Sequence, residues 1–216
     1  GKIDLIYIDP PFDSKADYRT KVVLPGVELE QKPTVIEQFA YSDTWSDGTA
    51  SYLAMITPRL ILMRELLAET GSIYVHLDWH VGHYVKVVMD EIFGKNLFRN
   101  EIIWHYSGWN KQLLTSFEKR HDTLFLYGKS DQQHFMSFFE MWDSKEEYVK
   151  KRKQKVHVDN DGREYVLSDA GGGERIKRYL DDVMREGVVV DDVWHMDKLN
   201  NSSNESVGYS TQKTEE

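Results

Sequence analysis

The 216-residue sequence contains no cysteine, which excludes disulfide bonds, thiolate metal sites and a cysteine nucleophile. It has no apolar run near the length of about eighteen residues expected of a membrane span, and no signal-like amino terminus. The sequence also has fewer basic than acidic residues, with 27 Lys and Arg against 36 Asp and Glu, and its net charge is −9. This balance argues against a general nucleic-acid coat protein, although it permits a local basic surface. Together the absences predict an intracellular, cytoplasmic protein with no membrane partner.

The apolar pattern predicts an α/β fold. With 40% hydrophobic and 12% aromatic residues, the chain has the composition of a folded protein. The short apolar run at 3–8 predicts a parallel strand buried on both faces, and 71–78 predicts a second strand. Helical spacing predicts helices at 51–69 and 81–92, the second ending at Gly94. Strands that alternate with helices favour parallel pairing through right-handed crossovers.

Two more strands are predicted at 101–106 and 122–127. Only a polar loop separates them, so they are expected to pair antiparallel as a hairpin. His76 and Asp78 fall at the end of the second predicted strand. They either line a pocket or form ordinary hydrogen bonds at a strand end, and the sequence leaves both readings open.

The first predicted strand ends in Asp9-Pro10-Pro11-Phe12. The prolines remove two N–H donors and fix φ, so they stop the strand. In open α/β sheets ligands bind beyond the carboxyl ends of the strands, which places Asp9 beside a pocket. Asp-Pro also commonly ends a strand without any function. The aromatic residue after two prolines makes the functional interpretation the stronger one.

This tetrapeptide resembles the catalytic Asp/Asn/Ser-Pro-Pro-Tyr/Phe motif of the amino-group DNA methyltransferases. The resemblance implies that the Asp9 carboxylate and the Pro10 carbonyl accept hydrogen bonds from an exocyclic amine and so weaken its conjugation with the ring. Phe12 would stack on the target base, which must first leave the duplex. Asp in the first position is more typical of adenine enzymes, so N6-adenine is favoured and N4-cytosine is the alternative.

Further segments resemble the same family in the same order, namely 51–60, 71–78, 100–106 and 119–129. The resemblance therefore implies a partial Rossmann-like methyltransferase sheet, with parallel strands and an antiparallel terminal hairpin, and an inserted target-recognition region. It also implies S-adenosylmethionine as cofactor and double-stranded DNA as partner. Because such enzymes include modification subunits of restriction-modification systems, a restriction subunit is a further expected partner.

The segment 145–155 carries six basic residues against two acidic ones. Such a run is usually a solvated helix face. In a protein that grips phosphates, a target-recognition surface is the sharper interpretation. The residues predicted to bind nucleic acid are Lys119, Arg120, Lys150, Lys151, Arg152 and Lys153.

Near the end of the sequence, Thr211-Gln212-Lys213 resembles a phrase of the family that contributes to the methyl-donor pocket, although Thr214 stands where the family has proline. Asp9 and these three residues are thus the predicted cofactor-binding residues. The glycine-rich cofactor turn that should follow is missing. Gly171-Gly172-Gly173 does not replace it, because no apolar strand is expected before it.

The predicted organisation is a catalytic part at 1–129, a target-recognition region at 130–204 and the truncated start of a cofactor-pocket segment at 205–216. A chain without the cofactor half would leave its first strand with one bare edge, which invites pairing. We therefore expect either self-association or a second polypeptide that completes the sheet. The alternatives are a catalytically inactive DNA-binding module and a different nucleotide-using enzyme in which Asp9 binds a metal.

Overall fold

The computed structural model describes residues 1–12, 17–21, 37–42, 48–108 and 112–199, and for 17–21 and 37–42 it describes the backbone alone. It divides into two compact units. The first unit contains Gly1–His134 and the segment that starts at Asp192, and the second contains Phe135–Asp191. Each unit is described below by itself.

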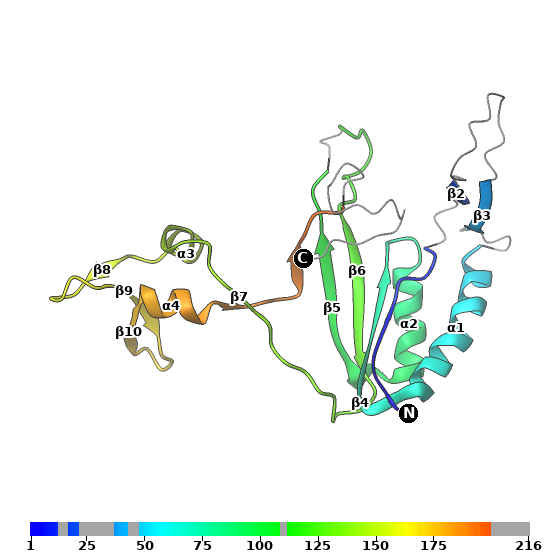
Figure 1. The fold of residues 1–216 in the computed structure, drawn as a ribbon, viewed down its shortest axis with the longest axis horizontal. Helices are drawn as coiled ribbons and strands as arrows, with labels where there is room; N and C mark the ends of the chain where they lie inside the picture. Colours follow the sequence, from blue (N-terminus) through cyan, green and yellow to red (C-terminus); the bar gives the residue numbers. More distant parts are fainter. Residues whose placement is uncertain (13–16, 22–36, 43–47, 109–111, 200–216) are drawn as a thin grey trace, which may run out of the picture. The chain divides into compact units, whose positions relative to one another are not determined.

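A five-stranded sheet forms the first unit (Figure 1). In spatial order its strands are β1 (Ile3–Ile8), β4 (Leu67–Leu77), β6 (His121–Gly128), β5 (Phe98–His105) and β12 (Val193–His195). The pairs β1/β4 and β5/β12 are parallel, whereas β6 runs antiparallel to both β4 and β5. The predicted parallel pair and the predicted antiparallel hairpin are therefore confirmed. A separate antiparallel hairpin is formed by β2 (Asp17–Lys21) and β3 (Glu37–Ser42).

Helices α1 (Thr49–Leu66) and α2 (Gly82–Phe93) pack on one face of this sheet (Figure 1), and a short 3-10 helix, η1 (Lys95–Leu97), follows α2. The turn into α2 is held by Asp78, whose carboxylate accepts a hydrogen bond of 2.9 Å from the amide of His80. Gly94 ends the helix with φ of +99°, a conformation that favours glycine. The predicted stop at this glycine is confirmed.

The main core lies between the helices and the sheet. Side chains alternate along a strand, so every second residue of β4 faces the helices. The fully buried members of this core are Tyr52, Ile56, Leu60, Leu67, Ile73, Val75, Leu77, Val81, Val85, Met89, Phe93, Phe125 and Tyr127. A smaller cluster of Ile102, Trp104 and Leu124, with Tyr74, Tyr106, Trp194 and Met196 against it, covers the opposite face. That opposite face carries the candidate site.

The first strand differs from its prediction in burial. Its position is as expected, but Leu5 is 60% exposed and Tyr7 is 49% exposed, so the expectation of a strand buried on both faces is wrong. Within the described residues β1 lies at the end of the sheet and pairs with β4 alone. In the part of the chain that the structure describes, the apolar run therefore forms an edge strand with exposed apolar side chains. The first helix also ends earlier than predicted, because β4 already begins at Leu67.

The second unit contains short elements. They are β7 (Phe139–Glu140), α3 (Lys145–Arg152), β8 (His157–Val158), β9 (Glu164–Asp169), β10 (Arg175–Tyr179), α4 (Leu180–Glu186) and β11 (Val188–Val189). Strands β8, β9 and β10 form an antiparallel sheet, and β7 pairs with β11. A small core of Tyr148, Val166, Leu180 and Val183 holds α3 and α4 together with β9.

Local signals account for the ends of α3. The Ser144 hydroxyl accepts a hydrogen bond from the amide of Glu147, which is the N-cap expected of a Ser-x-x-Glu sequence. Lys153 ends the helix in the left-handed region, with φ of 49°.

The triple glycine at 171–173 forms the turn between β9 and β10. The sequence predicts that no apolar strand precedes it, and the strand that does precede it, β9, is mostly polar and exposed, with only Val166 fully buried. The chain then returns as an antiparallel partner strand, whereas a cofactor loop leads into a helix.

Candidate active site

Asp9 lies at the carboxyl end of β1, where the sequence predicts it. Ile8 is in register with Val75 of β4, so the next residue, Asp9, reaches the level of His76. Its side chain retains 26% of its surface exposed. Asp9 can thus contact both the protein interior and a ligand beyond the strand end.

His76 connects Asp9 to the interior of the sheet. The Nδ1 atom of His76 is 3.1 Å from Oδ1 of Asp9, and Nε2 is 3.2 Å from Oδ2 of Asp122. The hydroxyl of Tyr7 lies 3.3 Å from Nδ1 as well. The histidine is fully buried, with 0% relative exposure. Three strands, β1, β4 and β6, therefore meet at one imidazole.

Asp122 holds the inner end of this network. It is 5% exposed, and its Oδ2 atom is 3.0 Å from Nζ of Lys198. Its other oxygen accepts a hydrogen bond of 3.2 Å from the hydroxyl of Tyr106. The Lys198 ammonium also lies 3.8 Å from the centre of the Tyr106 ring, a cation–π distance. The buried carboxylate is thus compensated from two sides.

The pKa values follow from these contacts. Burial alone would raise the pKa of Asp122, but the hydrogen bond with His76 and the charge of Lys198 hold it below its usual range. Burial, and then the charges of Asp9 and Asp122, raise the pKa of Tyr7 to about 12. The same causes, with Asp122 as the charge, raise the pKa of Tyr106. Both phenols are therefore neutral near pH 7, where Asp122 is ionised.

Aromatic rings form the walls around His76. The ring of Phe12 meets it edge-on at 5.3 Å between centroids, and Trp104 lies on another side at 5.4 Å. Trp104 is fixed in turn by a hydrogen bond of 2.7 Å from its Nε1 to the carbonyl of Met196. These rings restrict water around the imidazole, which strengthens its polar contacts.

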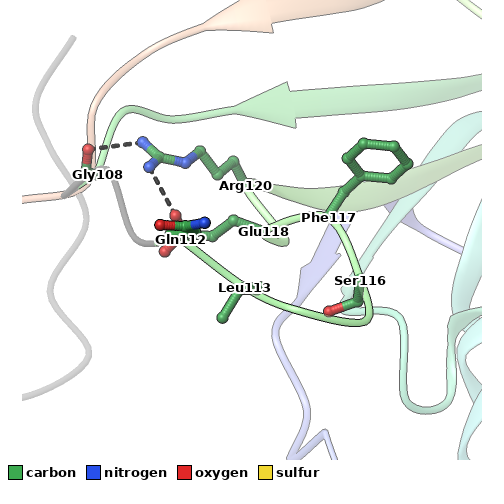
Figure 2. A pocket seen from close by; sticks show the side chains of 7 residues that line it. All are labelled: Gly108, Gln112, Leu113, Ser116, Phe117, Glu118 and Arg120. Carbon is green, nitrogen blue, oxygen red and sulfur yellow. Dashed lines mark hydrogen bonds and ion pairs between the residues drawn. The ribbon is translucent and has the colours of Figure 1, made fainter.

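A cavity of about 560 Å³ lies in the loop between β5 and β6, which joins the site at the same edge of the sheet (Figure 2). It is lined by Gly108, Gln112, Leu113, Ser116, Phe117, Glu118 and Arg120. The Arg120 guanidinium donates to the carbonyl of Gly108 at 2.6 Å and to the carboxylate of Glu118 at 2.8 Å. Arg120 therefore braces the loop internally, and its predicted contact with nucleic acid remains a prediction.

Lys119 and the side chains at the tip of this loop are placed differently. The Lys119 ammonium lies 4.2 Å from the centre of the Trp79 ring. Leu114 is 93% exposed and Phe117 is 96% exposed. The loop thus presents two large apolar side chains to solvent.

The four basic residues predicted in the second unit belong to α3 and its end. Lys150, Lys151, Arg152 and Lys153 are all exposed, and none forms an ion pair with a described carboxylate. Lys145 differs, because its ammonium lies 2.7 Å from Asp181 and 3.2 Å from Glu164. Lys151 and Arg152 also lie 5.4 Å and 5.8 Å from the centre of the Trp142 ring.

The structure brings together Asp9, Phe12 and His76, and the sequence analysis singled out all three of these residues. Pro10 and Pro11 are half-buried directly after Asp9. Thr211, Gln212 and Lys213 lie outside the described residues. Among the described residues, no group of three or more His, Asp or Glu side chains is arranged to hold a metal ion.

Sequence reasoning missed the contributions of Tyr7, Asp122 and Lys198. For Asp122 a signal existed, because a carboxylate at the first positions of a strongly apolar strand needs a partner when it is buried. Nothing in the local sequence around Lys198 distinguishes it from other lysines.

The protein is an α/β protein in which an acidic residue and two prolines follow the carboxyl end of β1, the end of a sheet at which ligands bind in open α/β folds. Residues 3–216 match the N6_N4_Mtase family of DNA methylases, and the chain belongs to this family. The predicted family resemblance and fold class are confirmed.

Curated relatives agree with this assignment. The chain is 28% identical to the EcoP15I Mod subunit of a type III restriction-modification enzyme from Escherichia coli, over 61% of this chain and 21% of that protein. It is 30% identical to the type II methyltransferase M.EcaI of Enterobacter cloacae, over 59% of this chain and 25% of that protein. The EcoPI Mod subunit of Escherichia phage P1 is 26% identical over 68% of the chain and 24% of that protein. The chain thus spans about a quarter or less of the length of these relatives.

None of the helices in the described ranges combines the length and the apolar character needed to cross a membrane.

Proposed function

We propose that this chain carries the catalytic and target-recognition parts of a DNA methyltransferase that transfers a methyl group from S-adenosylmethionine to the exocyclic amine of a flipped base, with N6 of adenine favoured. The observation that carries the proposal is the Asp9 carboxylate, partly exposed at the carboxyl end of β1 and followed by Pro10-Pro11-Phe12, in a chain of the DNA methylase family. Methylation of cellular DNA places its action inside the cell.

The residues at the strand end support this chemistry. An exocyclic amine becomes nucleophilic when hydrogen-bond acceptors draw its lone pair out of conjugation. The Asp9 carboxylate and the Pro10 carbonyl supply two acceptors, and the prolines keep them in place without reorganisation. Phe12 is half-buried against the main core, so its ring is held firmly enough to stack on a base.

S-adenosylmethionine, when bound, supplies the electrophilic methyl group. Asp9 fits such a cofactor, because the exposed part of its carboxylate can accept a hydrogen bond from the ammonium group of S-adenosylmethionine. Thr211, Gln212 and Lys213 are proposed to complete the pocket. The exposed apolar edge of β1 supports the further proposal that another strand, from a second polypeptide or a second copy, pairs there.

Double-stranded DNA is the proposed partner. We assign 1–129 to catalysis, 130–204 to target recognition and 205–216 to the start of the cofactor pocket. The separate second unit and its four exposed cations support a recognition role for the middle segment. Relatives that are Mod subunits of restriction-modification enzymes support a restriction subunit as a further partner.

Methyl transfer from isotopically labelled S-adenosylmethionine to duplex DNA tests the proposal, with the methylated nucleoside identified by mass spectrometry. Cofactor binding is titrated by calorimetry in the same buffer. We expect N6-methyladenine, and we expect Asp9→Ala to lower the rate by about 10³-fold while DNA affinity is retained. Detection of N4-methylcytosine instead would support the methyltransferase but show that its target base is cytosine. DNA binding without any methylated product, alone or with the completing polypeptide, would overturn the proposal in favour of an inactive DNA-binding module.

A further inference from the structure

His76 contacts two carboxylates at once, and this is an unusual position for a buried imidazole. Its two ring nitrogens lie 3.1 Å from Asp9 and 3.2 Å from Asp122. A hydrogen bond at such a distance requires a proton between the two atoms. A neutral imidazole has a single N–H, so it can donate to only one of the two carboxylates, and its other nitrogen could accept from the Tyr7 hydroxyl at 3.3 Å. A ring protonated at both nitrogens satisfies both carboxylates.

The described titratable groups that face His76 come from two strands. Asp9 and Tyr7 face it from β1, and Asp122 faces it from β6. Behind Asp122 lie the ammonium of Lys198 and the neutral hydroxyl of Tyr106.

With His76 protonated, the carboxylates of Asp9 and Asp122 face two cations, the imidazolium and the Lys198 ammonium. Buried charges are tolerated when they are paired and hydrogen-bonded in this way.

We propose that His76 is a positioning residue, protonated at both ring nitrogens, that fixes the orientation and the negative charge of the Asp9 carboxylate through Nδ1 while Asp122 anchors the ring through Nε2. This inference rests on the proposed function, because it assigns His76 a role in the reaction of Asp9. His76 itself is fully buried, so its role is exerted through Asp9.

The role of such a residue is preorganisation. An acceptor that is already oriented before the amine arrives needs no rearrangement as charge develops in the transition state. Misplacement of a reacting group by about 1 Å can cost about 10²-fold in rate. Loss of the Asp9 contact should therefore lower kcat, whereas KM for DNA should change little.

Two conservative variants separate this role from simple packing. In His76→Asn the amide can replace the donor at Nδ1 and keep the contact with Asp9. In His76→Gln the longer side chain replaces the donor at Nε2 and keeps the contact with Asp122. We expect His76→Leu and His76→Gln to lower kcat by about 10²-fold and His76→Asn to recover at least part of that loss. A purely structural role would not favour asparagine over glutamine.

A matched control is His105→Asn, which changes an exposed histidine on β5 of the same sheet. It should leave kcat unchanged. Asp9→Ala is assayed in parallel. If Asp9→Ala is as active as the wild type, the proposed function fails. If Asp9→Ala is inactive but all three His76 variants retain wild-type kcat, only the positioning role fails.

The protonation state is measured independently of turnover. Two-dimensional ¹H–¹⁵N correlation spectra of the imidazole nitrogens of the wild-type protein at pH 7 should show both nitrogens of His76 protonated, and Asp122→Asn should abolish this state. The signals of the His76 ring are assigned by their absence from the spectrum of His76→Asn. A neutral His76 ring with an unprotonated Nδ1 would overturn the inference, whatever the kcat values of the variants.

Discussion

The Nζ atom of Lys198 lies 3.0 Å from Oδ2 of Asp122, the same oxygen that contacts Nε2 of His76. Lys198 follows the short strand β12 and Asp122 is the second residue of β6, so the last described segment of the first unit is joined to a buried acidic residue of that unit. This ion pair links the segment after β12 to the candidate site that contains Asp9. Its removal should be visible in both stability and acid sensitivity.

Lys198→Met is expected to lower the melting temperature at pH 7 and to make the protein more sensitive to acid. The folded-state pKa of Asp122 is depressed, so its ionisation stabilises the fold above the unfolded pKa of about 4 and this contribution is lost as pH falls through the folded pKa. Without Lys198 the folded pKa rises and the loss begins at higher pH. Melting curves recorded between about pH 3 and about pH 7 measure this. Lys155→Met, at an exposed lysine of the second unit, is the control and should show no such pH dependence.

Phe12→Ala should lower kcat/KM for DNA by roughly 5- to 150-fold, which is the range given by base–aromatic stacking of 1–3 kcal/mol. Phe12→Tyr should keep most of the activity because it keeps the ring. Phe12 also packs against the main core, so the melting temperature is measured for each variant. Phe12→Leu serves as the control for packing. Equal activity of the leucine and tyrosine variants would argue against stacking.

The edge of β1 should support association of the purified chain. Leu5 is 60% exposed on this strand, and Leu5→Lys should reduce the oligomer fraction measured by light scattering, because charged side chains block edge pairing. Leu62 on α1 has a similar exposure of 63%, so Leu62→Lys is a matched control. A wild-type chain that stays monomeric without any partner, or equal effects of the two variants, would contradict pairing through this edge.

Lys150→Gln combined with Lys151→Gln should weaken DNA binding to all sequences alike. Each phosphate contact that is lost should lower the slope of log affinity against log salt by about one. Fluorescence anisotropy at several salt concentrations measures both quantities. Lys145→Gln is the control, since Lys145 is already paired with Asp181 and Glu164. A double variant with the wild-type salt slope would show that α3 does not contact phosphates.

The exposed tip of the β5–β6 loop is expected to contact the distorted duplex. Apolar side chains can insert between base steps and unstack them, which favours a duplex from which a base is flipped out. Phe117→Ser should therefore reduce the fluorescence increase of 2-aminopurine placed at the target position, with about the same affinity for non-target DNA. Met136→Ser, at a 65% exposed apolar residue of the second unit, is the control. Unchanged base-flipping fluorescence in the Phe117 variant would exclude this role.

The local parts of this protein follow from its sequence. The apolar run at 3–8, the two prolines after Asp9 and the glycine at 94 predict where elements begin and end, because φ restriction, missing N–H donors and glycine's positive φ act within a few residues. The periodicity of the helices and the alternation of strands likewise predict the pairing of β1 with β4 and of β5 with β6. The tetrapeptide at the strand end indicates the family from sequence alone, without information about which residues lie close together in space.

The tertiary structure alone decides which residues surround the site. Burial of a strand depends on its neighbours, so the same apolar run that predicts a central strand becomes the exposed edge β1. His76, Asp122 and Lys198 come from three separate segments, and only the register of β4 against β6 and the return of the chain after β12 bring their charges together. Sequence determines the chemistry that each segment carries. The three-dimensional pairing determines which carboxylate meets which proton.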